Sequence, residues 1–320
     1  MTATSAAPRT TALTGATGFI GSHILGELIG CGHHVRALTR RPPPVSADTT
    51  SVTWIQGDIT DRGALDRLIA GADSVIHCAG LVKARSRQAF DAANADAVEA
   101  LVECLRAGPG PRPALLHMSS LAAREPELSA YGASKARGEA AVTAAGDAFD
   151  WLVIRPPAVY GPGDLEILKL LRSLRFGIGL VPGSRDNRVS VIFAPDLARL
   201  AVRWVEAPAL CGQVIEVDDA ISGGYTMADI NRIAANALDR NVRLVSVPRS
   251  VLTIAAQINT AFTRLTGRTA MLTPDKVREL VHPDWVARPT PQAALLTAPA
   301  TGLAEGLGIT VRWYRKHGLL

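Results

Sequence analysis

The residues best suited to chemistry in this sequence are a tyrosine and a lysine four positions apart, in the stretch YGASK that begins at Tyr131. At the start of a predicted helix over residues 131–145, this spacing puts Tyr131 and Lys135 on one face. An ammonium beside a phenol favours the phenolate. We therefore expect Lys135 to lower the pKa of Tyr131 toward neutrality, making the tyrosine a usable proton donor and acceptor. Taken alone, such a pair is more often an ordinary pair on a helix surface.

Ser120 is a second candidate because it comes just after a predicted strand over residues 114–118. The strand would carry Ser120 to the same crevice as the tyrosine, where its hydroxyl could hydrogen-bond a carbonyl oxygen. The simpler alternative is that Ser120 caps a helix or a turn, as serine commonly does.

A phosphate-binding turn is predicted where a strand over residues 11–14 gives way to a helical pattern that starts at residue 22. Gly15 would permit the tight turn, Gly18 would let the backbone approach a pyrophosphate, and Gly21 would let the helix pack closely on the sheet. The helix N-terminus would offer free N–H groups to the phosphates. An ordinary strand-to-helix turn is the alternative, but this spacing and context favour a dinucleotide site.

The elements that must position these residues alternate between strands and helices. Apolar runs predict strands over residues 34–39, 51–56, 74–78, 114–118 and 151–154, and helical spacing predicts helices over residues 62–70, 90–106 and 131–145. This alternation indicates an α/β fold with a doubly wound parallel sheet of the Rossmann type.

Beyond residue 164 the alternation breaks down, which predicts a smaller lobe. We expect a dinucleotide-binding domain over residues 1–160, with residues 189–217 returning to it as two strands and a helix. Residues 161–188 and 218–320 would form a substrate-binding lobe and a closing helix, placed over the carboxyl ends of the strands. Residues 167–180 and 250–272 are rich in apolar side chains, so we expect an apolar pocket for a carbonyl substrate without phosphates. Their few cations are Lys169, Arg172, Arg175, Arg264 and Arg268.

Composition narrows the class of protein. The 320 residues carry a net charge of +5 with the basic residues scattered, which excludes a nucleic-acid surface. The four cysteines have no metal-ligand spacing, so we expect no metal site and interpret them as small buried hydrophobes in a reducing compartment. The polar N-terminus predicts no signal peptide and a cytoplasmic protein. The apolar stretch over residues 251–265 is interrupted and too short to span a membrane, so a surface or core helix is expected there.

Together these motifs resemble the extended branch of the short-chain dehydrogenase/reductase superfamily, which includes NAD-dependent epimerases and dehydratases, hydroxysteroid dehydrogenases and dihydroflavonol reductases. The resemblance covers nearly the whole chain. The matching motifs are the glycine turn at residues 14–21, Gly57-Asp58, Cys78-Ala79-Gly80, Asn94, Ser119-Ser120, Tyr131 with Lys135, residues 155–163 and the closing helix from Gly302 to Tyr314.

The resemblance implies a role for each matching residue. Tyr131 would be the general acid and base, Lys135 would hold the nicotinamide ribose, and Ser120 would polarise the substrate oxygen. Asn94 would be a further catalytic residue, although a helix cap or a solvated position is nearly as good an interpretation. The implied cofactor-binding residues, besides Tyr131 and Lys135, are Gly15, Thr17, Gly18, Phe19, Ile20, Gly21, Arg40, Arg41, Asp58, Ile59, Cys78, Ala79, Gly80, Pro156, Ala158 and Val159.

The cofactor is expected to be NADP(H). In the family pattern an acidic residue at the end of the second strand binds the ribose 2′-hydroxyl and repels a 2′-phosphate. Here that place is taken by Thr39, followed by Arg40 and Arg41, and the next acid is Asp48. A guanidinium can bind the phosphate through charged hydrogen bonds, whereas the alternative is that both arginines are merely solvated.

The sequence thus predicts an NADP-dependent oxidoreductase that interconverts a carbonyl and an alcohol on a small to medium, largely apolar substrate. The rivals are a sugar-nucleotide epimerase or dehydratase on the same scaffold, and a non-catalytic NADP-sensing protein. Only ten residues separate Ser120 from Tyr131, which is short for the extended branch and makes nucleotide-sugar enzymes a poorer guide. Substrate identity, reaction direction and the presence of a homodimer stay open.

Overall fold

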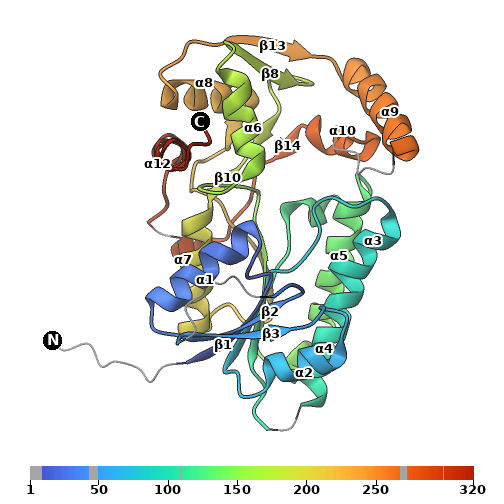
Figure 1. Cartoon of the computed structure of the whole chain (residues 1–320), viewed down its shortest axis with the longest axis vertical. Helices are drawn as coiled ribbons and strands as arrows, with labels where there is room; N and C mark the ends of the chain where they lie inside the picture. Colours follow the sequence, from blue (N-terminus) through green and yellow to red (C-terminus); the bar gives the residue numbers. More distant parts are fainter. Residues whose placement is uncertain (1–8, 43–49, 109, 267–271, 298) are drawn as a thin grey trace, which may run out of the picture.

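A computed structural model of the chain describes residues 9–42, 50–108, 110–266, 272–297 and 299–320. Its centre is a seven-stranded parallel sheet in the order β11-β6-β5-β4-β1-β2-β3 (Figure 1). The strands are β1 (Thr10–Thr14), β2 (His34–Thr39), β3 (Val52–Gln56), β4 (Ser74–His77), β5 (Ala114–Met118), β6 (Trp151–Arg155) and β11 (Gln213–Glu216). The inner strands are apolar runs because helices cover both faces of the sheet.

Helices cover both faces of the sheet (Figure 1). On one face α1 (Phe19–Gly30), α7 (Ala194–Glu206) and α11 (Pro291–Thr297) share a buried core with the strands. On the other face lie α2 (Arg62–Ile69), α4 (Ala97–Ala107) and α5 (Ala130–Thr143). The predicted doubly wound parallel sheet is therefore confirmed.

The helix predicted over residues 90–106 is longer and less regular than its sequence pattern suggests. It consists of α3 (Arg87–Asp91), a π-helical turn (Ala92–Asp96) and α4 in direct succession. Such π-helical turns are frequent at functional sites. Here the turn contains Asn94 and points its side chain into the protein, where it is 1% exposed.

A smaller lobe sits over one end of the sheet (Figure 1). Its core is formed by α6 (Leu165–Leu174), α8 (Met227–Ala237) and the closing helix α12 (Leu303–Lys316). Beside them are two parallel strands, β8 (Ile178–Pro182) and β13 (Arg243–Val247), followed by α9 (Arg249–Thr266) and α10 (Pro274–Leu280). No helix in the described part of the chain combines the length and the apolarity needed to cross a bilayer.

The run over residues 189–193, predicted as one strand returning to the main sheet, is divided at Ser190. β9 (Arg188–Val189) pairs with β12 (Tyr225–Thr226) and β14 (Asp284–Trp285), while β10 (Val191–Phe193) pairs with β7 (Ala158–Tyr160). The division has a physical cause, because buried Ser190 donates to Asp218 (3.0 Å) and accepts from the Ala287 N–H (3.1 Å). Of the two returning segments, only β11 joins the seven-stranded sheet.

The cysteines differ from the expectation that all are buried. Cys104 is buried and Cys78 is half-buried, but Cys31 and Cys211 are exposed, and all four are free thiols. Cys31 follows the end of α1 and Cys211 lies in the loop before β11, where a small side chain meets solvent. The interpretation as buried hydrophobes is therefore wrong for Cys31 and Cys211.

Candidate active site

The glycine turn between β1 and α1 depends on close packing that no side chain would permit. Gly15 has a φ of +75°, and a Cβ there would lie 2.7 Å from the Ala79 nitrogen. A Cβ at Gly21 would lie 2.0 Å from the Gly15 carbonyl oxygen. The first turn of α1 is therefore held against the loop after β4, as the spacing predicts.

The entrance to α1 suits an anion. Gly18 is the N-cap, and because it has no side chain, none competes for the first N–H groups of the helix. Thr17 and Gly18 are exposed, and Phe19 and Ile20 are half-buried in the first turn. Free N–H groups at a helix N-terminus bind phosphate oxygens, so these residues fit the pyrophosphate of a dinucleotide.

Thr14 connects this turn to the next loop. Its hydroxyl accepts hydrogen bonds from the N–H groups of Cys78 (3.2 Å) and Ala79 (3.1 Å), which fixes the backbone just beyond β4. The third residue of that loop, Gly80, has no room for a side chain, because a Cβ would lie 2.8 Å from Asn94 Oδ1 and 3.3 Å from Lys135 Nζ. The glycine turn, the β4 loop and α5 thus converge on one point.

The Asn94 side chain connects the β4 loop to α5 through hydrogen bonds. Its Oδ1 accepts from the Leu81 N–H (2.8 Å), and its Nδ2 donates to the Leu81 carbonyl (2.9 Å) and to Ser134 Oγ (3.0 Å). The side chain is neither solvated nor a helix cap. All of these bonds are internal, so the geometry favours a residue that positions the β4 loop against α5.

Tyr131 and Ser120 lie together at the carboxyl end of β5. Burial raises the pKa of Tyr131 to about 12, Ser120 at hydrogen-bonding range lowers it, and the charges of Glu279 and Cys78 raise it. Ser120 also caps the short 3-10 turn that follows it, accepting from the Ala122 N–H at 3.2 Å. The cap that was the simpler interpretation of Ser120 is therefore present, and it orients the hydroxyl beside the tyrosine.

Lys135 does not act on Tyr131 as the spacing predicts. Its ammonium donates to the Met118 carbonyl (3.0 Å), and burial lowers the pKa of Lys135 to about 8, while Cys78 and Glu139 oppose the shift. The expected lowering of the tyrosine pKa is wrong, because burial of the phenol raises the pKa more than the hydrogen bond with Ser120 lowers it. At neutral pH the site therefore contains a protonated phenol and a buried ammonium.

Glu139 is a residue of this site that the sequence interpretation missed. It is buried on the same helix and accepts from Arg155 through both carboxylate oxygens (2.6–3.1 Å) and from Ser119 (2.5 Å). This network ties α5 to the ends of β5 and β6. The available signal was the spacing, since Glu139 is four residues beyond Lys135 and shares its face of the helix.

The N-terminus of α5 is also held by a helix of the lobe. The N-cap Ser129 donates to Glu279 of α10, and the Ala130 N–H donates to Asp275 (3.2 Å). Arg278 Nε donates to the Leu128 carbonyl at 2.8 Å. The loop and first turn that carry Tyr131 are thus fixed by residues nearly 150 positions later. A local sequence pattern could not predict this contact, because the two segments are far apart in the sequence.

The predicted adenosine end lies at the carboxyl ends of β2 and β3. Thr39 is buried, and its hydroxyl donates to the Arg41 carbonyl (2.9 Å), which leaves Arg40 and Arg41 exposed. Hydrogen bonds from the backbone and side chain of Thr60 lower the pKa of Asp58, and the charge of Arg40 lowers it further. Asp58 and the adjacent, half-buried Ile59 follow β3. Asp48 lies outside the described residues.

Pro156, Ala158 and Val159 follow β6 at the same edge of the sheet. The carbonyl of buried Pro156 accepts from the Leu121 N–H (2.9 Å), which links this segment to the turn that contains Ser120. Ala158 is exposed and Val159 is half-buried in β7. Most residues predicted for the site lie at, or shortly after, the carboxyl end of a strand. The others, Phe19, Ile20, Gly21, Asn94, Tyr131 and Lys135, lie in helices.

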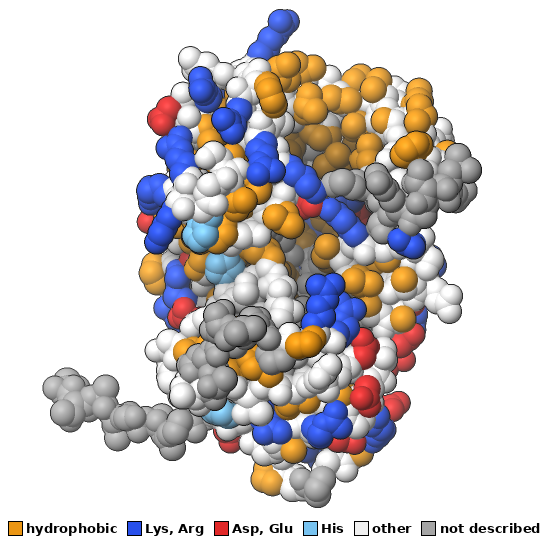
Figure 2. All heavy atoms as spheres, viewed as in Figure 1, with side chains coloured by type: hydrophobic (Ala, Val, Ile, Leu, Met, Phe, Trp, Pro, Cys, Tyr) orange, Lys and Arg blue, Asp and Glu red, His pale blue; other side chains and the backbone are white. Residues whose placement is uncertain are grey.

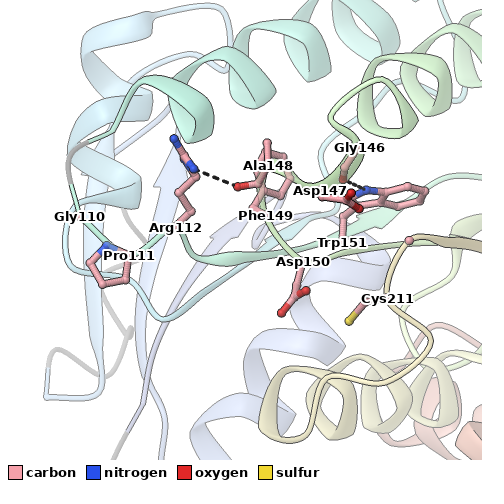
Figure 3. Close-up of a pocket in the computed structure, with 11 residues that line it drawn as sticks. Gly110, Pro111, Arg112, Gly146, Asp147, Ala148, Phe149, Asp150, Trp151 and Cys211 are labelled. Atoms are coloured by element: carbon pink, nitrogen blue, oxygen red, sulfur yellow. Dashed lines mark hydrogen bonds between the residues drawn. The ribbon is translucent and has the colours of Figure 1, made fainter.

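A pocket of about 500 Å³ lies elsewhere, at the amino ends of β5, β6 and β11 (Figure 3). Its lining includes Arg112, which donates to the Ala148 carbonyl (3.2 Å), and Trp151, which donates to the Gly146 carbonyl (3.0 Å). It is on the opposite edge of the sheet from Tyr131, because parallel strands share one direction. We therefore place the site at the carboxyl edge.

The sequence model of the NAD dependent epimerase/dehydratase family matches residues 11–217, more than half of the chain. A ceramide reductase from Caulobacter vibrioides (strain NA1000 / CB15N) is 40% identical over 311 residues, which cover 97% of this chain and 95% of the relative. The Bordetella bronchiseptica enzyme WbmH, solved in complex with NAD+, has a TM-score of 0.74 at 17% identity and covers 97% of this chain and 100% of its own. The human epimerase family protein SDR39U1, solved with NADPH, has a TM-score of 0.71 at 20% identity, with coverage of 94% and 99%. The two structural likenesses show a shared fold.

Proposed function

This chain belongs to the NAD dependent epimerase/dehydratase family, and from that premise we propose that it is an NADP(H)-dependent reductase of a lipid ketone. The family and the reductase relatives support an NAD(P)-dependent oxidoreductase that interconverts a carbonyl and an alcohol. The preference for NADP(H) and the lipid substrate are our proposal. The observation that carries the proposal is Tyr131, a protonated phenol beside Ser120 at the carboxyl edge of the sheet.

The residues present fit an NADP(H) molecule. The Gly15–Gly21 packing and the uncapped N-terminus of α1 provide a cradle for the pyrophosphate that a side chain would fill. Exposed Arg40 and Arg41 follow a threonine instead of an acid, which favours the 2′-phosphate of NADP(H) over the bare ribose of NAD(H). When bound, the cofactor supplies the hydride that reduces the carbonyl carbon.

Side chains of the protein would supply the proton that the substrate oxygen receives during reduction. Ser120 would donate a hydrogen bond to the substrate carbonyl oxygen, and Tyr131 would then give its proton to that oxygen as negative charge develops. A pKa of about 12 keeps Tyr131 protonated at neutral pH, so it is ready as an acid in the reducing direction. Lys135, charged below a pKa of about 8, would hold the nicotinamide ribose, as the family resemblance implies. Asn94, Glu139 and Glu279 would act by positioning these groups.

The substrate class rests on two observations. The relative of 40% identity is named a ceramide reductase. The lobe carries exposed apolar side chains, including Leu180 of β8 and Ile258 of α9, on the elements expected to cover the substrate. We therefore propose a ceramide-type lipid that carries a ketone as the substrate, and residues 161–188 with 218–320 as the segments that recognise it.

A sugar nucleotide is the rival substrate, and two of the cations in the segment over residues 167–180 are already bound by other groups of the chain. A diphosphate needs available cations, but Lys169 pairs with Glu166 (2.8 Å), and Arg172 donates to the Leu319 carbonyl (3.0 Å). Arg175 is exposed on the surface of the lobe, and the side chains of Arg264 and Arg268 lie outside the described part of the chain.

We also propose that the protein works in the cytoplasm. All four cysteines are free, and Cys31 and Cys211 are exposed to solvent, which suits a reducing compartment. Extraction of the native protein from separated cell fractions would test this directly.

The test is NADPH oxidation, followed by absorbance, with a ketone of the ceramide class in detergent micelles, with short-chain ketones and with dTDP- and UDP-linked keto sugars. We expect turnover of the lipid ketone, and a loss of about 10²-fold or more in Tyr131→Phe because the proton donor is gone. The matched control is Tyr160→Phe. Its hydroxyl is buried without a hydrogen-bond partner among the described residues, so this change should leave turnover intact. Near wild-type turnover in Tyr131→Phe, or turnover of nucleotide sugars alone, would contradict the proposal.

A further inference from the structure

Helix α9 exposes the face that a surface helix normally buries. Val251, Ile254 and Ile258 share one face by their spacing, and their side chains are 52%, 57% and 65% exposed. The opposite face meets the protein through buried Ala256 and more polar positions. An amphipathic helix of a globular protein ordinarily turns its apolar stripe to the core. This stripe is therefore available for something other than folding.

The strands next to α9 continue this apolar surface. In β8, Gly179 and Val181 are buried while Ile178 and Leu180 are exposed, and Val245 of β13 pairs with Leu180 on the same face. Figure 2 shows hydrophobic side chains gathered around a hollow in the upper right of the view, where Figure 1 places β8, β13 and α9. We call this surface the apolar end of the lobe, and define it by Phe176, Ile178, Leu180, Val245, Val251, Ile254 and Ile258.

The segment that contains β13 and α9 is rich in arginine and has no acidic residue. Between Asp239 and Asp275 the chain has five arginines and no lysine, aspartate or glutamate. Arg243 pairs with Ile178 in the β13–β8 register and so lies on the apolar face, and exposed Arg249 is the first residue of α9. An apolar face with cations and without acids matches the interface of a bilayer that contains anionic lipids.

We propose that the apolar end of the lobe docks on an anionic phospholipid bilayer, so that the lipid substrate passes from the bilayer into the site. The identity of the substrate rests on the proposed function, whereas the docking itself requires no turnover. A second copy of the chain is disfavoured as the occupant, because two such faces would bring arginines against arginines. A bilayer offers the opposite charge together with an apolar interior.

The first experiment measures sedimentation of the full chain with vesicles, without substrate or cofactor. Vesicles of phosphatidylcholine alone are compared with vesicles that also contain phosphatidylglycerol. We expect binding to the mixed vesicles, and at least a tenfold weaker association, roughly, for the double variant Ile254→Asn, Ile258→Asn, since two exposed apolar side chains no longer enter the bilayer. The control is Val214→Asn, on the edge strand β11, where the side chain is 37% exposed but far from α9. It should bind as the wild type does.

The second experiment tests the charges. Arg243→Gln and Arg249→Gln should each weaken binding to the mixed vesicles by about fivefold and leave the weaker association with phosphatidylcholine unchanged. Arg62→Gln, an exposed arginine on α2, is the matched control. Equal binding to both vesicle types, by wild type and variants alike, would overturn the proposal.

Two outcomes separate this proposal from its rivals. If analytical ultracentrifugation shows a wild-type dimer that the Ile254, Ile258 double variant abolishes, the face binds a second copy and the proposal fails. If the double variant keeps the urea unfolding midpoint of the wild type while losing vesicle binding, docking is supported. Vesicle binding by a chain that reduces no carbonyl would leave docking supported and remove the proposed function alone.

Discussion

Two helices of comparable length, α5 and α9, reverse the usual relation between polarity and burial. The buried residues of α5 include Ser134, Lys135 and Glu139 together with two glycines, one of which packs so tightly that a Cβ would lie 2.3 Å from the Asn94 carbonyl. The exposed residues of α9 include Ile254 and Ile258. One helix places charges inside the protein, and the other places aliphatic side chains in water.

Burying a charge and exposing an apolar side chain have different free-energy costs, and the two helices therefore indicate different roles. A buried charge is tolerated only when it is hydrogen-bonded, and in α5 each of Ser134, Lys135 and Glu139 has a defined partner. Such a helix is fixed in place, as chemistry requires. An exposed apolar stripe needs no partner to fold, and its unfavourable hydration is relieved only on binding. The comparison therefore separates a rigid site for reaction from a surface for association.

The largest effect expected from this comparison follows from Lys135→Met. Turnover should fall by about 10²-fold or more because the ammonium proposed to hold the nicotinamide ribose is removed, while the packing volume is nearly kept. Steady-state kinetics measure the loss. Lys169→Met, on the exposed surface of α6, is the control and should retain activity. A variant with unimpaired turnover would show that the buried lysine has no part in the reaction.

Lys135→Met should also change how the free energy of unfolding depends on pH. The pKa of Lys135 is lowered from 10.5 to about 8 by burial, so the folded chain binds fewer protons than the unfolded chain between those values. The penalty of the buried ammonium is present in full below pH 8 and is relieved as the pH rises toward 10.5. From denaturant unfolding, the free energy of unfolding of the wild type should rise relative to Lys135→Met over that range, by on the order of 3 kcal/mol. Parallel pH profiles for the two proteins would contradict the assignment.

An intermediate effect is expected on cofactor affinity, because Arg40 and Arg41 are proposed to bind the 2′-phosphate of NADPH through their charge. Replacing Arg40 or Arg41 by Ala should raise the dissociation constant of NADPH by about ten- to a hundredfold, since one charged hydrogen bond is worth roughly 1.5 to 3 kcal/mol. NADH binding should hardly change. Fluorescence titration with both cofactors measures the difference, and Arg62→Ala on α2 is the control. If the wild type binds both cofactors equally, specificity for NADP(H) is wrong.

The smallest effect concerns the free energy of unfolding. Val142 of α5 is fully buried, so Val142→Ala should cost about 2 kcal/mol. Ile258→Ala in α9 should cost under about 0.5 kcal/mol, although it removes more atoms, because that side chain is 65% exposed. Urea unfolding of both variants measures the pair. A large cost at Ile258 would mean that the stripe packs against the protein in solution.

Local patterns in the sequence were sufficient for much of the fold. The bounds predicted for β2 and β5 are those observed, because each strand is followed by residues that end it: two arginines and three prolines after β2, and two serines after β5. The turn at Gly15 was also predictable, since positive φ and close backbone contact both demand glycine. The Tyr131 and Lys135 pair could be found because one helical turn relates the two residues.

Features that depend on distant contacts could not be predicted. Val189 and Val191 belong to one apolar run but to different small sheets, because Ser190 between them is bound by Asp218. The direction of the Tyr131 pKa shift depends on its burial and on Glu279, which comes from the lobe. The exposure of the α9 stripe was equally hidden, because periodicity identifies an apolar face without saying what covers it.

The hydrogen bond from Ser129 to Glu279 has a consequence for synthesis of the chain, because Glu279 is made long after Ser129. A nascent chain that ends before α10 already contains all seven strands of the central sheet and Tyr131 itself. It lacks the carboxylates of Asp275 and Glu279 that hold the first turn of α5. The first turn of α5 can therefore take the arrangement seen in the complete chain only after α10 has been synthesised, although every strand of the central sheet precedes α10 in the sequence.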